Sequence, residues 1–139
     1  NESGTEQRRI EFLEPVDPDA VFEVAHSYDI GLALEPGRDK NNQIALSNKI
    51  FTYLLAGNAV VFSATPAQKL FYEAHPEIGW LYPCGDVQAL VEILNQISKD
   101  QSVLMGCKQK ALQLAADVYN WEAEQVRLLH LVESAVIDA

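Results

Sequence analysis

The spacing of short apolar runs along the chain is the feature that most limits its fold. Four such runs stand apart, at residues 10–13 (IEFL), 30–34 (IGLAL), 59–63 (AVVFS) and 79–82 (GWLY). The run at residues 30–34 is continuously apolar, which is typical of a strand that is covered on both faces. Segments with apolar residues at helical spacing separate the four runs. Strands that alternate with helices predict a mainly parallel sheet with right-handed crossovers.

Residues that favour helix ends support the same organisation. Asp17, Ser47 and Asp86 stand where a side chain can cap a helix start, and Gly57 stands where a helix end tolerates left-handed geometry. The predicted helices span residues 18–28, 47–56, 66–74, 87–97, 102–118 and 120–137. We therefore expect an α/β fold, Rossmann-like, with three αβα layers and a mainly parallel sheet of about four strands.

Size and charge limit the possible partners. The chain has 139 residues, the size of one domain, and no linker divides it. Acidic residues outnumber basic ones 20 to 10, so the net charge is −10. This balance argues against nucleic acid and anionic membranes as partners, because both require a basic face. No apolar stretch approaches the ~20 residues of a membrane span.

The cysteines and histidines show no metal or redox pattern. Cys84 and Cys107 form no C-x-x-C motif, which is typical of reduced thiols in a cytoplasmic protein. His26, His75 and His130 are widely spaced and have no metal-ligand spacing with the cysteines or acids. We expect no metal and no cofactor.

Candidate ligand contacts lie where the predicted strands end, because parallel α/β sheets bind ligands beyond their carboxyl ends. The loop at residues 35–46 is long and contains Glu35 and Asp39, which are either acid–base carboxylates or solvated surface charges. It leads into Ser47-Asn48-Lys49 at a helix start. Free N–H groups there suit phosphate, and a bound anion would relieve the conflict between Lys49 and the helix dipole. The alternative is that Lys49 simply reaches into solvent.

The segment SNKIFTYLLAGNAVV at residues 47–61 resembles the NKIFEYLAAGLPVV segment of GT-B retaining glycosyltransferases, in the large glycogen synthase-like family (glycosyl transferases group 1). Three further segments agree in order and spacing. VFEVAHSYDIGLAL resembles the family's helix followed by "aDigl", GWLYPCGDVQALVEIL resembles its "G.lv.pgd.eaLa..i", and Asn120-Trp121 resembles its "fsW". The resemblance covers residues 10–132.

The resemblance implies that the chain is the donor-binding, C-terminal domain of such an enzyme, which transfers a sugar from a nucleotide-sugar with retention and without a metal. It places the backbone of Val16 and Asp17 at the base. It places the N–H groups of Ser47 and Asn48, with Lys49, at the diphosphate. The same comparison puts Thr52 at the ribose position, and Glu35 and Thr65 at possible sugar or loop contacts. It assigns no catalytic residue.

Two positions depart from the family pattern. Thr52 and Ile44 stand where the family has the two glutamates of its E-x7-E pattern, and neither can accept two vicinal hydroxyls as a carboxylate does. Either Glu35 supplies the missing carboxylate or the donor site is altered. The alternative function is therefore a non-catalytic Rossmann-like module, with a degenerate donor site, used for assembly or regulation.

The family's first two strands, with their phosphate-binding Arg and Lys, have no counterpart in the sequence. We therefore expect residues 1–139 to form a partial donor domain, truncated at its N-terminus, with residues 1–9 irregular. The acceptor-binding domain is missing, so the chain alone is expected to be inactive. Without the two strands, the run at residues 30–34 must pair directly with residues 10–13 or form a homodimer through an exposed sheet edge.

Overall fold

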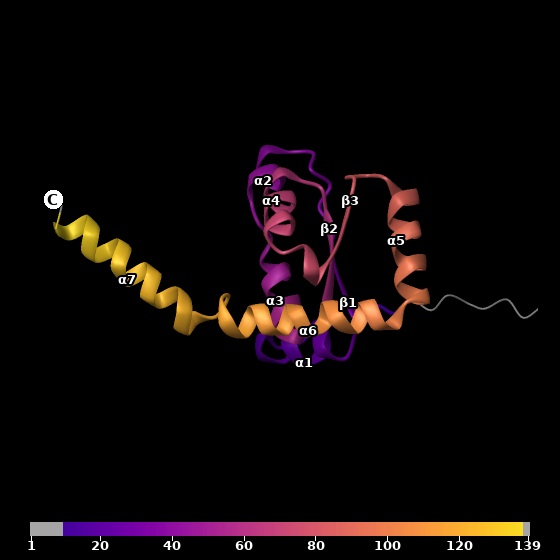
Figure 1. The fold of residues 1–139 in the computed structure, drawn as a ribbon, viewed down its shortest axis with the longest axis horizontal. Coiled ribbons are helices and arrows are strands. Elements are labelled where there is room, and N and C mark those ends of the chain that lie inside the picture. Colours follow the sequence, from indigo (N-terminus) through magenta and orange to yellow (C-terminus); the bar gives the residue numbers. More distant parts are fainter. Residues whose placement is uncertain (1–9, 138–139) are drawn as a thin grey trace, which may run out of the picture.

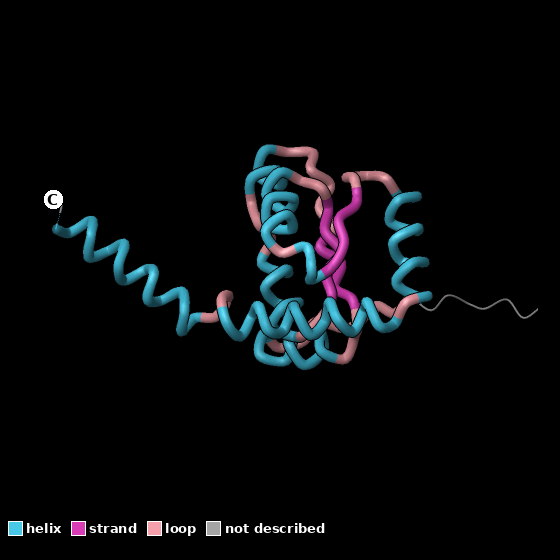
Figure 2. Tube along the Cα trace, viewed as in Figure 1, coloured by secondary structure: helices cyan, strands magenta, loops and turns pink. Residues whose placement is uncertain are grey.

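A computed structural model describes residues 10–137 of the chain. The fold is α/β, with a parallel sheet between helical layers, as in Rossmann-like αβα proteins (Figures 1 and 2). The strands are β1 (Ile30–Ala33), β2 (Ala59–Ser63) and β3 (Gly79–Tyr82), in the order β1-β2-β3. The helices are η1 (Pro18–Ala20), α1 (Val21–His26), α2 (Lys40–Ile44), α3 (Asn48–Ala56), α4 (Pro66–Ala74), η2 (Pro76–Ile78), α5 (Val87–Lys99), α6 (Gln101–Asp117) and α7 (Trp121–Ile137).

The central strand, β2, explains why its sequence is continuously apolar. It pairs in parallel with β1 on one side and β3 on the other, with Ile30 opposite Ala59 and Val60 opposite Gly79. All five of its residues are buried. Successive side chains of a strand point to opposite faces, so both faces of β2 contribute to the core.

The alternating side chains of β2 divide the core into two clusters. Val60 and Phe62 pack with α3, α4 and the carboxyl half of α6. Ala59 and Val61 pack with α5 and the amino half of α6. In Figure 1, α3 and α4 lie on one side of the sheet, α5 lies on the other, and α6 runs across one end of it. These two clusters define the three layers.

The expectation of about four strands was one too many. Residues 10–17 contain no regular element, and Ile10 and Phe12 are 80% and 92% exposed. Direct pairing with residues 30–33 was therefore also wrong. Instead, Glu11 and Leu13 line a groove of about 620 Å³ beside β1. The ring of Tyr53 lies against Gly31, and its hydroxyl donates to the Leu32 carbonyl oxygen at 3.4 Å, so this side chain occupies part of the edge that a fourth strand would need.

The predicted helix ends were partly right. The side chains of Thr65 and Asp86 accept hydrogen bonds from N–H groups in the first turns of α4 and α5. Gly57 ends α3 with a φ of 72°, in the left-handed region. The predicted side-chain caps at Asp17 and Ser47 do not form. At Asp17 the backbone carbonyl takes the first bond instead, from the N–H of Ala20 at 2.9 Å.

The last helix, α7, extends away from the rest of the molecule (Figure 1). Its large apolar side chains are exposed by 50% or more at Trp121, Val126, Leu128, Leu129, Leu131, Val132 and Val136. No described helix is long and apolar enough to cross a membrane. The expectation for residues 1–9 lies outside the described residues.

Candidate functional site

Ser63, the last residue of β2, ties together the chain segments at the carboxyl edge of the sheet. Its hydroxyl donates to the carbonyl oxygen of Ala33 at 3.2 Å and accepts from the N–H of Glu35 at 2.6 Å. These two bonds fix the point at which the chain leaves β1. The backbone of Glu35 is therefore held in place, and its side chain starts from a defined position.

Gln68 supports the same point from α4. Its side-chain Oε1 accepts from the backbone N–H of Ser63 at 3.0 Å, and its backbone N–H donates to Oγ1 of Thr65 at 3.4 Å. The residue is fully buried, and its Nε2 has no hydrogen-bond partner among the described residues. Because Oε1 is fixed by Ser63, the orientation of the amide is set and Nε2 is left as an unsatisfied donor.

Gly37 brings the loops that follow all three strands together. Its φ is 63°, which favours glycine. A Cβ at this position would lie 3.5 Å from Cys84 Sγ, in the loop after β3, and 3.5 Å from Thr65 Cγ2, in the loop after β2. The long loop after β1 therefore passes close to both other loops. All three loops meet at the carboxyl edge of the sheet, where parallel α/β sheets bind their ligands.

The start of α3 faces this region without a side-chain cap. Ser47 occupies the N-cap position, but its hydroxyl makes no capping bond. The side chains of Thr65, Asp86 and Asp100 do cap the starts of α4, α5 and α6. The N–H groups at the start of α3 therefore lack the side-chain acceptor that those three helices have.

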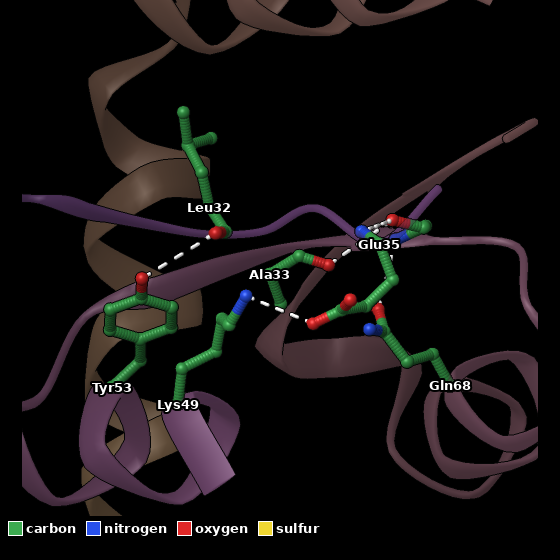
Figure 3. A network of polar contacts seen from close by, with 7 residues as sticks. Leu32, Ala33, Glu35, Lys49, Tyr53 and Gln68 are labelled. Atoms are coloured by element: carbon green, nitrogen blue, oxygen red, sulfur yellow. Dashed lines mark hydrogen bonds and ion pairs between the residues drawn. The ribbon is translucent and has the colours of Figure 1, made fainter. Parts of the chain in front are cut away.

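Lys49, in the first turn of α3, pairs with Glu35. Its Nζ lies 2.9 Å from Oε1 of Glu35, and the two side chains are 39% and 18% exposed (Figure 3). Lys49 thus has an ion-pair partner while its side chain stays partly exposed to solvent. Tyr53, one turn further along α3, is half-buried, and burial raises the pKa of its hydroxyl while the charge of Lys49 opposes the rise.

The remaining predicted site residues are spread more widely. Thr65 lies at this edge as the cap of α4, and Asn48 follows Ser47 as the first residue of α3. Val16 and Asp17 lie in the exposed segment before η1, and neither forms a hydrogen bond or ion pair with the start of α3. The structure therefore groups the diphosphate candidates with Glu35 and Thr65, but it does not join the two base candidates to them.

Thr52 and Ile44 are the two positions that depart from the family pattern, and among the described residues the fold brings no carboxylate into contact with either of them. The hydroxyl of Thr52 lies 3.5 Å from the carbonyl oxygen of Asn48, one turn back in the same helix. Ile44 ends α2 and is 68% exposed. Asp39 accepts from the N–H of Asn42 at 2.8 Å and so caps α2. Of the acidic side chains considered from the sequence, Glu35 is the one that reaches the start of α3.

Sequence reasoning missed Ser63 and Gln68. A polar residue at the end of an otherwise apolar strand was a usable signal for Ser63, because a buried hydroxyl needs hydrogen-bond partners. Gln68 carried no such signal, because glutamine is an ordinary residue on a helix surface. Its burial depends on how α4 packs on β2.

The histidines have structural partners. His26 Nδ1 lies 2.8 Å from the carbonyl oxygen of Ala56, and His75 Nε2 lies 2.9 Å from the Tyr119 hydroxyl. His75 also packs edge-on against the ring of Tyr119. Within residues 10–137, no three His, Cys, Asp or Glu side chains come together as a possible metal site.

Comparisons with protein-family models, with curated proteins and with solved structures find no match to this chain. The class that the fold defines is a Rossmann-like α/β protein with its polar cluster at the carboxyl edge of a parallel sheet. The resemblance to glycosyltransferases rests on the sequence segments quoted above.

Proposed function

We propose that this chain is the donor-binding portion of a retaining GT-B glycosyltransferase. The observation that carries the proposal is the uncapped start of α3 with Lys49, next to the loop held by Ser63. Uncapped N–H groups and a nearby cation at the carboxyl edge of a parallel sheet suit a diphosphate. The same residues lie in the segment that most resembles the family.

In the proposed reaction, the bond between the anomeric carbon of the sugar and the diphosphate oxygen breaks. A new bond forms from that carbon to an acceptor hydroxyl on the same face, and the hydroxyl proton goes to the departing diphosphate. The N–H groups of Ser47 and Asn48 and the ammonium of Lys49 stabilise the charge of the leaving group. No metal is needed for this role.

Several parts of the proposal concern the intact protein. The acceptor would bind a further domain, so residues 1–139 alone would bind nucleotide without transferring sugar. The backbone of Val16 and Asp17 would meet the base after moving toward α3.

A cytoplasmic location fits the two free cysteines, Cys84 and Cys107.

The test is a two-dimensional ¹⁵N–¹H NMR titration of residues 1–139 with UDP, GDP and ADP. We expect shifts at the amides of Ser47, Asn48 and Lys49 with at least one nucleotide. The nucleotide with the largest effect identifies the base, and added shifts at Val16 and Asp17 support their assignment. The absence of shifts at millimolar nucleotide contradicts donor binding by this chain.

A second candidate is a non-catalytic module with a degenerate donor site. It is favoured by Thr52 and Ile44, because no carboxylate stands at either position and the Thr52 hydroxyl faces its own helix. Replacing Thr52 with Glu separates the two. A large gain in nucleotide affinity indicates a site that has decayed, whereas a loss indicates a site specialised around threonine.

A further inference from the structure

Glu35 lies where it affects any anion that approaches Lys49. Its carboxylate already holds the Lys49 ammonium at 2.9 Å, and its side chain is only 18% exposed. A diphosphate at the start of α3 would compete with this carboxylate for the same cation. It would also be repelled by it, because like charges a few ångströms apart interact strongly away from bulk water.

Gln68 offers the Glu35 carboxylate a second position. Glu35 and Gln68 are both hydrogen-bonded to Ser63, the former through its N–H and the latter through Oε1. Figure 3 draws both residues, Glu35 in the loop after β1 and Gln68 on α4, each bonded to Ser63. The Nε2 of Gln68 is buried and has no partner among residues 10–137. An unsatisfied buried donor bonded through its own amide to Ser63, which also holds the backbone of Glu35, is a position that the Glu35 carboxylate does not occupy in this structure.

We infer that Glu35 is a specificity-determining residue of the proposed donor site, which exchanges its partner when a diphosphate binds. In the empty site the carboxylate pairs with Lys49. When a diphosphate takes Lys49, the carboxylate moves to the amide of Gln68. This inference rests on the proposed function, because it assumes that the start of α3 receives a diphosphate.

Such an exchange selects ligands by charge. A neutral nucleoside cannot displace a carboxylate from Lys49, whereas a diphosphate carries enough charge to compete for the ammonium. The ligand class that fits is therefore a diphosphate group, free or esterified.

The test compares the wild-type chain with Glu35→Gln, using inorganic pyrophosphate and UDP, GDP and ADP as probes in NMR titrations. Glutamine keeps the size of the side chain, and the bond from the N–H of residue 35 to Ser63 is unaffected. We expect Glu35→Gln to bind pyrophosphate roughly three- to tenfold more tightly, as removal of one nearby like charge predicts. In the wild type, pyrophosphate should shift the side-chain NH₂ signals of Gln68.

The matched control is Glu73→Gln. Glu73 pairs with Lys69 on α4 at 3.7 Å, and both side chains are more than half exposed, so this variant makes the same charge change away from the site. We expect it to bind pyrophosphate as the wild type does. An equal gain in both variants overturns the inference, since it shows a general charge effect.

The remaining outcomes separate the inference from the proposed function. If the wild type binds a nucleoside diphosphate and Glu35→Gln binds it equally or more weakly, the inference is wrong and the function stands. If neither binds any probe at millimolar concentration, both are wrong. Should Glu35→Gln unfold, Glu35→Ala is titrated in its place, with the same expected gain.

Discussion

At the scale of single residues, Gln68 links the core to the candidate site. Its Oε1 satisfies the N–H of Ser63 at the end of β2, and the side chain is fully buried. Few polar residues have this position, because burial of an amide is favourable only when its hydrogen bonds are made. Here the Oε1 of the amide is satisfied, and its Nε2 has no hydrogen-bond partner among residues 10–137.

Replacing Gln68 with Ala should lower the free energy of unfolding by about 1–3 kcal/mol, because the buried N–H of Ser63 loses its acceptor. Urea unfolding followed by circular dichroism measures the change. The control is Gln88→Ala, since Gln88 is exposed and bonds only to Glu92 on the surface of α5. Equal losses in both variants would contradict the buried role of Gln68.

Gly31 leaves room for the Tyr53 ring to pack directly against the backbone of β1. A Cβ added there would overlap the ring of Tyr53, which covers this part of β1. We expect Gly31→Ala to destabilise the fold by about 1–3 kcal/mol, because overpacking forces side chains from their preferred rotamers. In the double variant with Tyr53→Ala the added cost of Gly31→Ala should fall to near zero. If Gly31→Ala still lowers the stability in the Tyr53→Ala background, the overlap with the Tyr53 ring is not the cause of the loss.

At the scale of elements, α6 depends on Asp100, the N-cap residue just before its first turn. Asp100 accepts hydrogen bonds from the side chain of Ser102 and the N–H of Val103, and these bonds lower the pKa of its carboxyl. The pKa in the folded protein is thus below that in the unfolded chain. The stabilisation is therefore present above the unfolded value and is lost as the pH falls through the folded value.

We expect Asp100→Asn to be less stable than the wild type at pH 7, and the difference to shrink as the pH falls below about 4. Thermal unfolding across that range measures it. The control is Asp117→Asn, at the carboxyl end of the same helix, where removal of a negative charge relieves an unfavourable interaction with the helix dipole. A difference for Asp100→Asn that is constant with pH would contradict the prediction.

Elements were predictable where local pattern and packing agree. The predicted strands at residues 59–63 and 79–82 coincide with β2 and β3, because both have a partner on the sheet. Residues 10–13 carry a similar pattern but no partner, so the pattern alone did not make a strand. The helix α2 was missed inside the long loop, although Asp39 caps it, because five residues are too few to show helical periodicity.

The candidate site was predictable in its position but not in its contacts. The rule that ligands lie at the carboxyl edge pointed to the start of α3 and to the loop with Glu35. The ion pair between Lys49 and Glu35 joins residues that the sequence separates by a loop and a short helix. Such a contact depends on the path of that loop, which Ser63 and Gly37 determine.

At the scale of the whole molecule, β1 leaves one edge of the sheet unpaired. The N–H of Ala59 donates to the carbonyl oxygen of Asp29, so alternate residues of β1 face β2 and the backbone groups of Ile30 and Leu32 face outward. Tyr53 covers one of these groups, the carbonyl of Leu32. The homodimer expected from the sequence through this edge stays a prediction, and a partner strand there would have to displace the Tyr53 side chain.

We expect the chain to self-associate with increasing concentration, as measured by sedimentation equilibrium. Leu32→Lys should weaken the association, because a charge on an edge strand opposes pairing. The control is Leu70→Lys, since Leu70 is exposed on α4, away from this edge. A monomer at all concentrations, or an equal effect of both variants, would contradict the predicted dimer.

The projecting helix α7 gives the molecule a built-in reference for the binding measurements. Its 17 residues span about 25 Å, and its side chains from Val126 to Val136 are exposed and lie away from the sheet. A ligand at the start of α3 leaves this far half of the helix in the same surroundings. Signals that move there report a change of buffer, pH or aggregation, so α7 calibrates each titration from within the same chain.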